Sequence, residues 1–87
     1  MPTWLVESYW PAAAGTPESA ADRLRQLATS DVRLIGVVHV PGDEMALWRL
    51  EAVDRATAEA ACAEAAITFE RIVEIVEIRQ IELAAGS

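Results

Sequence analysis

The sequence predicts a small α+β domain with four strands and two helices. Four runs are rich in the β-branched and aromatic residues that favour strands. Two further segments, both rich in alanine, separate the first run from the second and the third run from the fourth. The sequence "PGDE" at residues 41–44 lies between the second and third runs and is typical of a hairpin turn. With only 87 residues, the chain is expected to form one domain, residues 1–87, with a thin core that an oligomer would help to bury.

The first strand is expected at Thr3–Trp10, because apolar residues there alternate between two faces and Pro11 then ends the run. The first helix is expected to run from Pro17 to about Thr29. Thr16 is the predicted N-cap, since threonine caps helices well and proline is favoured at the first helical position. Apolar residues within this segment recur at helical spacing, namely Ala20, Leu24, Leu27 and Ala28.

The second and third strands are expected at Val32–Val40 and Met45–Ala52, joined by the hairpin. Asp54 is the predicted cap of a second helix, Arg55–Ala66, whose alanines would allow close packing against a sheet.

The last run, Ile72–Leu83, has a mixed signal. Its isoleucines recur every three residues, which is nearer to the period of a helix than to that of a strand. Its β-branched content favours a strand, and we predict a strand here.

The resulting order, β-α-β-β-α-β, is that of a ferredoxin-like sandwich with an antiparallel sheet in the order 4-1-3-2. Both helices would then cover one face of the sheet and leave the other face open. Strict alternation along the strands predicts which residues this open face carries: Leu5, Glu7, Tyr9, Arg33, Ile35, Val37, His39, Met45, Leu47, Arg49 and Glu51.

The length of the last run predicts a homodimer. Twelve residues from Ile72 to Leu83 would span about 40 Å, well beyond the ends of the shorter strands beside them. Unpaired strand edges invite association with another chain. Pairing with a second copy would satisfy the excess length, so we expect a dimeric α+β barrel.

The composition of the chain argues against two classes of binding partner. Seven arginines, no lysine and fourteen acidic residues give a net charge of -7, which argues against nucleic acid and against an anionic membrane surface. The apolar runs are far shorter than the ~20 residues of a membrane span, and no secretory leader is visible. A single cysteine, Cys62, fits a reducing compartment and is expected to be a buried apolar side chain rather than a nucleophile. We therefore expect a soluble cytoplasmic protein.

His39 is the only histidine, and it is a candidate metal ligand. Asp43 and Glu44 follow it across the hairpin turn, so that an imidazole and carboxylates would converge on Ni²⁺ or another divalent ion, with a second copy supplying the missing ligands. Two alternatives are a histidine that only forms hydrogen bonds near a turn and a catalytic acid or base.

Two further groups of residues are candidates for a ligand pocket. Glu7, Arg49 and Glu51 are charged residues on the two central strands and form either an ion-pair network at an interface or a site with a base and an anion-orienting arginine. Tyr9 and Trp10 are expected to line a pocket for a flat apolar molecule. The other two tryptophans, at positions 4 and 48, are expected in the core.

The chain resembles a family of small bacterial ferredoxin-like proteins of unknown function, some of whose members are described as nickel-binding. The resemblance covers residues 3–78 and rests on "WLVESYW", on "LEAVD" at residues 50–54 and on "AAITFERIVEI" leading into the last strand. It implies a dimer and a metal ion. Trp48 stands near a position where the family commonly has cysteine, so this chain lacks the thiolate that relatives would offer there.

Three functional hypotheses follow. The first is a homodimer that binds a metal ion, with nickel suggested by the resemblance, or a small ligand. The second is a cofactor-independent enzyme, such as a monooxygenase, cyclase or isomerase, acting on an apolar small molecule. The third is a structural or regulatory partner protein. A fold of this kind hosts many functions, so the residues of the site must decide between them.

Overall fold

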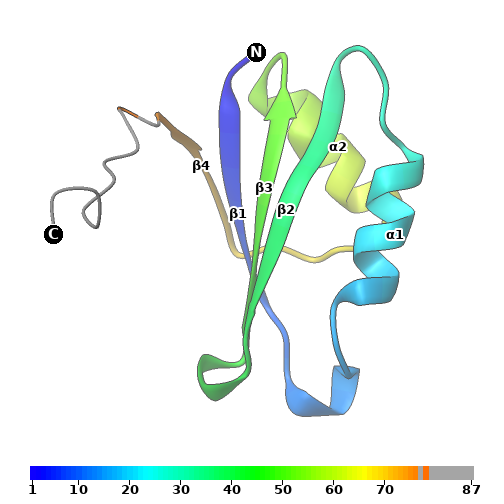
Figure 1. Cartoon of the computed structure of the whole chain (residues 1–87), viewed down its shortest axis with the longest axis vertical. Helices are drawn as coiled ribbons and strands as arrows, with labels where there is room; N and C mark the ends of the chain where they lie inside the picture. Colours follow the sequence, from blue (N-terminus) through cyan, green and yellow to red (C-terminus); the bar gives the residue numbers. More distant parts are fainter. Residues whose placement is uncertain (77, 79–87) are drawn as a thin grey trace, which may run out of the picture.

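The computed structural model describes residues 1–76 and 78. Its elements follow the predicted order and are shown in Figure 1: β1 (Thr3–Tyr9), η1 (Ala12–Ala14), α1 (Glu18–Gln26), β2 (Val32–Val40), η2 (Pro41–Asp43), β3 (Met45–Ala52), α2 (Arg55–Glu64) and β4 (Arg71–Ile75). The predicted bounds of the second and third strands are confirmed. Both helices end earlier than predicted.

The four strands form one antiparallel sheet in the order β2-β3-β1-β4. This is the predicted order 4-1-3-2 counted from the other edge, so the α+β architecture and the sheet order are confirmed. The arrangement is compatible with a ferredoxin-like sandwich. Strands β1 and β3 are central, and β2 and β4 are the two edges.

Both helices pack on one face of the sheet, where the core lies (Figure 1). The sheet contributes the large side chains, above all Trp48, which is 0% exposed. The helices contribute mostly small side chains, which allow their backbones to approach the sheet closely. The main members of this core are Val6, Trp48, Leu50 and Ile72 from the strands and Ala20, Ala21, Leu24, Ala58, Ala61 and Cys62 from the helices.

The two helix starts differ in how well the sequence predicts them. At α2 the carboxylate of Asp54 accepts a hydrogen bond from the Thr57 backbone N–H at 2.8 Å, which confirms the predicted cap. Hydrogen bonding to Thr57 also lowers the pKa of Asp54. At α1 the predicted Thr16 cap is wrong. Pro17 occupies the cap position and its carbonyl oxygen accepts the first helical hydrogen bond, from Ala21.

A β-bulge in β2 changes which residues face the helices. Leu34 pairs with Leu50 and Gly36 pairs with Arg49, so Ile35 is an extra residue between two paired positions of β2. An extra residue reverses the side-chain alternation for the rest of the strand. The prediction that Val37 and His39 lie on the open face is therefore wrong: they pair with core residues of β3 and lie on the helix side, while Val38 and Val40 lie on the open face.

Strand β4 is shorter than the predicted run Ile72–Leu83. Its last residue, Ile75, pairs with Thr3, which is the first residue of β1. Beyond this point β1 offers no further strand residue as a partner, so β4 ends. Val76 and Ile78 are exposed and outside any strand, and the rest of the predicted run, residue 77 and residues 79–83, lies outside the described residues.

The two helices that the structure describes are both too short to cross a lipid bilayer.

Candidate ligand-binding face of the sheet

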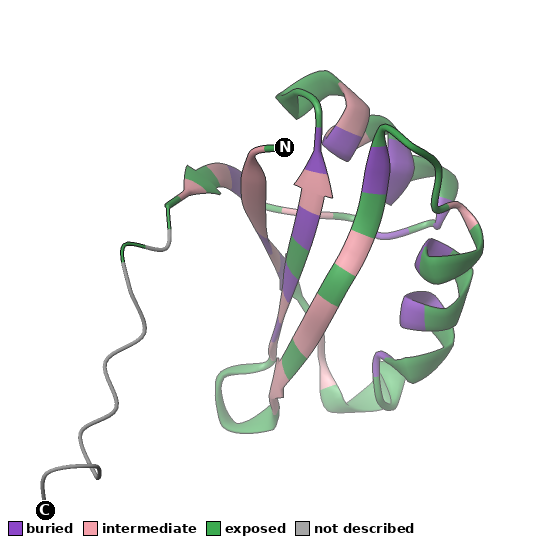
Figure 2. Ribbon diagram, turned by 45° about the horizontal axis from the view of Figure 1, so that its top comes forward, coloured by how far each residue is buried: buried purple, intermediate pink, exposed green. Residues whose placement is uncertain are grey.

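The sheet has one surface that neither described helix covers, and we call it the open face (Figure 2). Its residues alternate with the core residues along each strand and pair with one another across the strands. Most of its aliphatic side chains are only half-buried, which leaves apolar surface in contact with water. The open face consists of Thr3, Leu5, Glu7, Tyr9, Arg33, Gly36, Val38, Val40, Met45, Leu47, Arg49, Glu51, Arg71, Val73 and Ile75.

Two ion pairs connect the central strands of the open face to its edges. Arg71 Nε lies 3.6 Å from Glu7 Oε2, and Arg33 Nε bonds Glu51 Oε1. Each pair joins residues that face each other directly in the strand register. The two glutamate side chains are only 24% and 25% exposed, and each is paired with an arginine from an edge strand.

Arg49 takes part in neither of these ion pairs. Its register neighbours are Leu5 on β1 and Gly36 on β2, and neither carries a charge. Among the ion pairs of residues 1–76 and 78, none includes Arg49. Sequence reasoning grouped Arg49 with Glu7 and Glu51, but the register gives both glutamates to other arginines.

Tyr9 and Trp10 do not share a pocket, because Tyr9 ends β1 on the open face whereas Trp10, just after the strand, packs against the core. Tyr9 is 56% exposed on the open face, and its hydroxyl donates a 3.5 Å hydrogen bond to Glu44 Oε2. Trp10 packs at the edge of the core on the helix side. Its indole N–H donates to the Gly15 carbonyl oxygen at 3.0 Å, and its ring meets Trp48 edge-on with centroids 5.9 Å apart.

The predicted metal ligands do not converge. His39 pairs with Ala46, a core residue, and therefore lies on the helix side of the sheet. Glu44 follows the turn η2 and its carboxylate reaches Tyr9, which is on the open face. Within the described part of the chain, no three His, Cys, Asp or Glu side chains gather closely enough to hold a metal ion.

The six predicted pocket residues thus fall into two sets. Glu7, Tyr9, Arg49 and Glu51 share the open face, whereas Trp10 and His39 lie on the side of the helices. The structure does not bring all six together.

The polar side chains inside the described core have hydrogen-bond partners. The Trp48 indole N–H donates to Ser8 Oγ at 2.9 Å, and the Ser8 hydroxyl donates in turn to the Ala46 carbonyl oxygen at 3.1 Å. Cys62 is fully buried, as predicted. Burial, together with the negative charge of Glu59, raises the pKa of its thiol to about 11. A thiol with such a pKa stays protonated near neutral pH and is a poor nucleophile.

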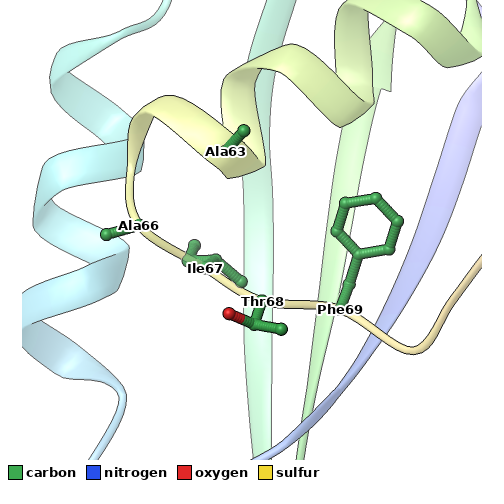
Figure 3. A pocket seen from close by; sticks show the side chains of 5 residues that line it. All are labelled: Ala63, Ala66, Ile67, Thr68 and Phe69. Atoms are coloured by element: carbon green, nitrogen blue, oxygen red, sulfur yellow. The ribbon is translucent and has the colours of Figure 1, made fainter.

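A separate open hollow of about 400 Å³ lies at the end of α2 (Figure 3). Ala63, Ala66, Ile67, Thr68 and Phe69 line it, and the Thr68 hydroxyl is its only polar side-chain group. Sequence reasoning missed this hollow, because the loop that forms it has no distinctive motif. Its lining offers a surface for apolar contact but no acid, base or nucleophile.

Comparison with known proteins found no matching family model, no similar curated protein and no similar solved structure. The resemblance to a bacterial family of unknown function, some of whose members are described as nickel-binding, stays a prediction.

Proposed function

We propose that this protein is a homodimer whose two open faces pack against each other and hold a small ligand between them. The observation that carries the proposal is the open face itself. Aliphatic side chains of all four strands, such as Leu5, Val38, Leu47 and Val73, lie together on a surface that no described helix covers. Contiguous apolar surface of this kind is typical of an interaction site.

The dimensions of the sheet fit such an interface. Four strands about 4.8 Å apart and about 7 residues long on average give a flat face of about 19 Å by 24 Å, or roughly 450 Å², before the height of its side chains is counted. Two such faces approach the 1,200–2,000 Å² total that a standard interface buries, by order of magnitude. Cross-strand ion pairs already neutralise both glutamates of the face, which lowers the cost of covering them.

The sequence after Ile75 supports the same assembly. Residues 76–83 keep the β-branched composition of a strand, yet β1 has no residue left to pair with them. A second copy is the partner that the sequence pattern predicts for them.

The metal prediction needs ligands beyond those of one protomer, and His39 lies on the helix side rather than on the face that the proposed dimer covers. His39 has no second histidine in the chain to join it, and Asp43 and Glu44 do not complete a set with it. A nickel site would therefore need ligands from the second copy. The alternative of a cofactor-independent enzyme stays a prediction.

Native mass spectrometry of the tag-free protein, with and without Ni²⁺, tests the proposal. We expect the wild type to be a dimer. Leu47→Asp should raise the dimer dissociation constant at least about 100-fold, because each dimer would bury two new carboxylates. Ala60→Asp adds the same charge at an exposed position of α2, away from the open face, and should leave the dimer intact. A monomeric wild type, or an intact dimer in Leu47→Asp, would refute the proposed interface.

A further inference from the structure

Arginines gather on the open face of a chain that is acidic overall. The chain carries -7, whereas the described strands of the open face carry three arginines and two glutamates, with Glu44 beside Tyr9 at the hairpin end of the face. Both strand glutamates are paired with Arg33 and Arg71, and Arg49 is the arginine of this face that has no acidic partner among the described residues. We infer that Arg49 binds the carboxylate of a small apolar molecule held against the open face. This inference rests on the proposed dimer and names the class of its ligand.

The position of Arg49 makes an anion necessary once the face is covered. Arg49 lies near the middle of β3, one of the two central strands, beside Leu5 of the other. When a face packs against its own copy, residues near its centre approach their equivalents across the two-fold axis. Two guanidinium groups brought together away from water repel each other and lose their hydration. A carboxylate between them removes both costs, and the planar guanidinium suits a carboxylate with two parallel hydrogen bonds.

Gly36 provides the room beside Arg49. It is the direct neighbour of Arg49 across the β2–β3 pairing, and a Cβ added to it would meet nothing within 4 Å. Its φ angle is not in the left-handed region, so neither the backbone nor packing within the protomer requires glycine there. Glycine inside a strand marks a bulge, as beside Ile35 here, or a place where a ligand or another backbone approaches closely. The missing side chain leaves open space on the sheet at the direct register neighbour of Arg49.

The other residues around this open space are apolar. Leu5 and Leu47 adjoin Arg49 on the central strands, and Val38 follows Gly36 on the same side of β2. One cationic anchor within an aliphatic surface is the arrangement that recognises a molecule with a carboxylate at one end and a hydrocarbon body. Octanoate is a suitable probe, and octanamide is the matched neutral compound.

The experiment is a titration of ¹⁵N-labelled protein with octanoate and with octanamide, followed by NMR, with native mass spectrometry of the same samples. We expect octanoate to bind about tenfold or more tightly than octanamide, because a hydrogen bond to a charged group is worth about 1.5–3 kcal/mol. The Gly36 amide should be among the signals that shift. Arg49→Gln should abolish the preference for octanoate, and Arg49→Lys should keep part of it. Arg25→Gln removes a paired arginine of α1, away from the open face, and should leave the preference unchanged.

The outcomes separate this inference from the proposed function. A dimer that shows no preference for octanoate, or keeps the full preference in Arg49→Gln, overturns the carboxylate site and leaves the dimer standing. A monomer overturns both. A dimer whose preference is lost in Arg49→Gln and kept in Arg25→Gln supports both.

Discussion

Ser8 is a strand residue whose hydroxyl satisfies the hydrogen-bonding need of a buried tryptophan. It is the buried polar side chain of the described core, at 0% exposure, and it lies directly opposite Ala46 in the register of β1 and β3. Its hydroxyl accepts from Trp48 and donates to the Ala46 carbonyl oxygen. A buried tryptophan needs an acceptor for its indole N–H, and the serine supplies one.

We expect Ser8→Ala to lower the free energy of unfolding by about 1–3 kcal/mol, because the Trp48 indole N–H would remain buried without an acceptor. Urea unfolding followed by tryptophan fluorescence measures this loss. Ser19→Ala makes the same chemical change at an exposed position of α1 and should alter stability by less than about 0.5 kcal/mol. Equal effects of the two substitutions would show that the hydrogen-bond chain contributes nothing.

At the scale of the element, the end of α2 contains a local strain. Ala66 has φ of 61°, in the left-handed region. Its N–H donates to the Ala63 carbonyl oxygen at 3.0 Å, and the N–H of Ile67 donates to that of Cys62 at 2.8 Å. These two bonds form a Schellman motif, which usually has glycine at the position of Ala66.

We expect Ala66→Gly to stabilise the protein by about 0.5–1 kcal/mol. Relief of the left-handed alanine, worth about 1–2 kcal/mol, exceeds the entropy that glycine adds to the unfolded chain. Ala60→Gly, within the same helix, should destabilise by about 1 kcal/mol. Thermal unfolding of both variants measures whether each is more or less stable than the wild type. A loss of stability in Ala66→Gly would contradict the prediction.

Strand β2 shows how far the sequence predicts an element. Its bounds, Val32–Val40, follow from the β-branched run and the hairpin turn after it. The bulge does not, because this run is apolar on both faces and a shift of one residue leaves its pattern almost unchanged. Gly36 is the one signal, since glycine within a strand is typical of a bulge. The missed bulge is why His39 was predicted on the wrong face.

At the scale of the whole molecule, the architecture was predictable and the pairing of charges was not. Hydrophobic periodicity predicts the order of strands and helices, because this pattern lies within each segment of the sequence. The partners of Glu7 and Glu51 depend instead on register between segments far apart in the chain. Arg33 and Arg71 come from the two edge strands, and no local pattern connects them to these acids.

The stability of the whole fold should also fall in alkaline solution, because Cys62 is fully buried between α2 and the sheet. Its pKa is raised from 9.0 to about 11, so above pH 9 the unfolded chain loses the thiol proton while the folded chain keeps it. The folded state then binds more protons than the unfolded state, and the free energy of unfolding decreases as pH rises.

We expect this effect to cost about 1 kcal/mol between pH 8 and pH 10, since one pKa unit corresponds to about 1.4 kcal/mol. Urea unfolding at both pH values measures it, with Cys62→Ala as the control that lacks the thiol but keeps every other titrating group. The variant should be less stable than the wild type at pH 8, because it leaves a small cavity, and should lose less stability on going to pH 10. Parallel pH profiles for the two proteins would mean that the thiolate is tolerated in the core, against the raised pKa.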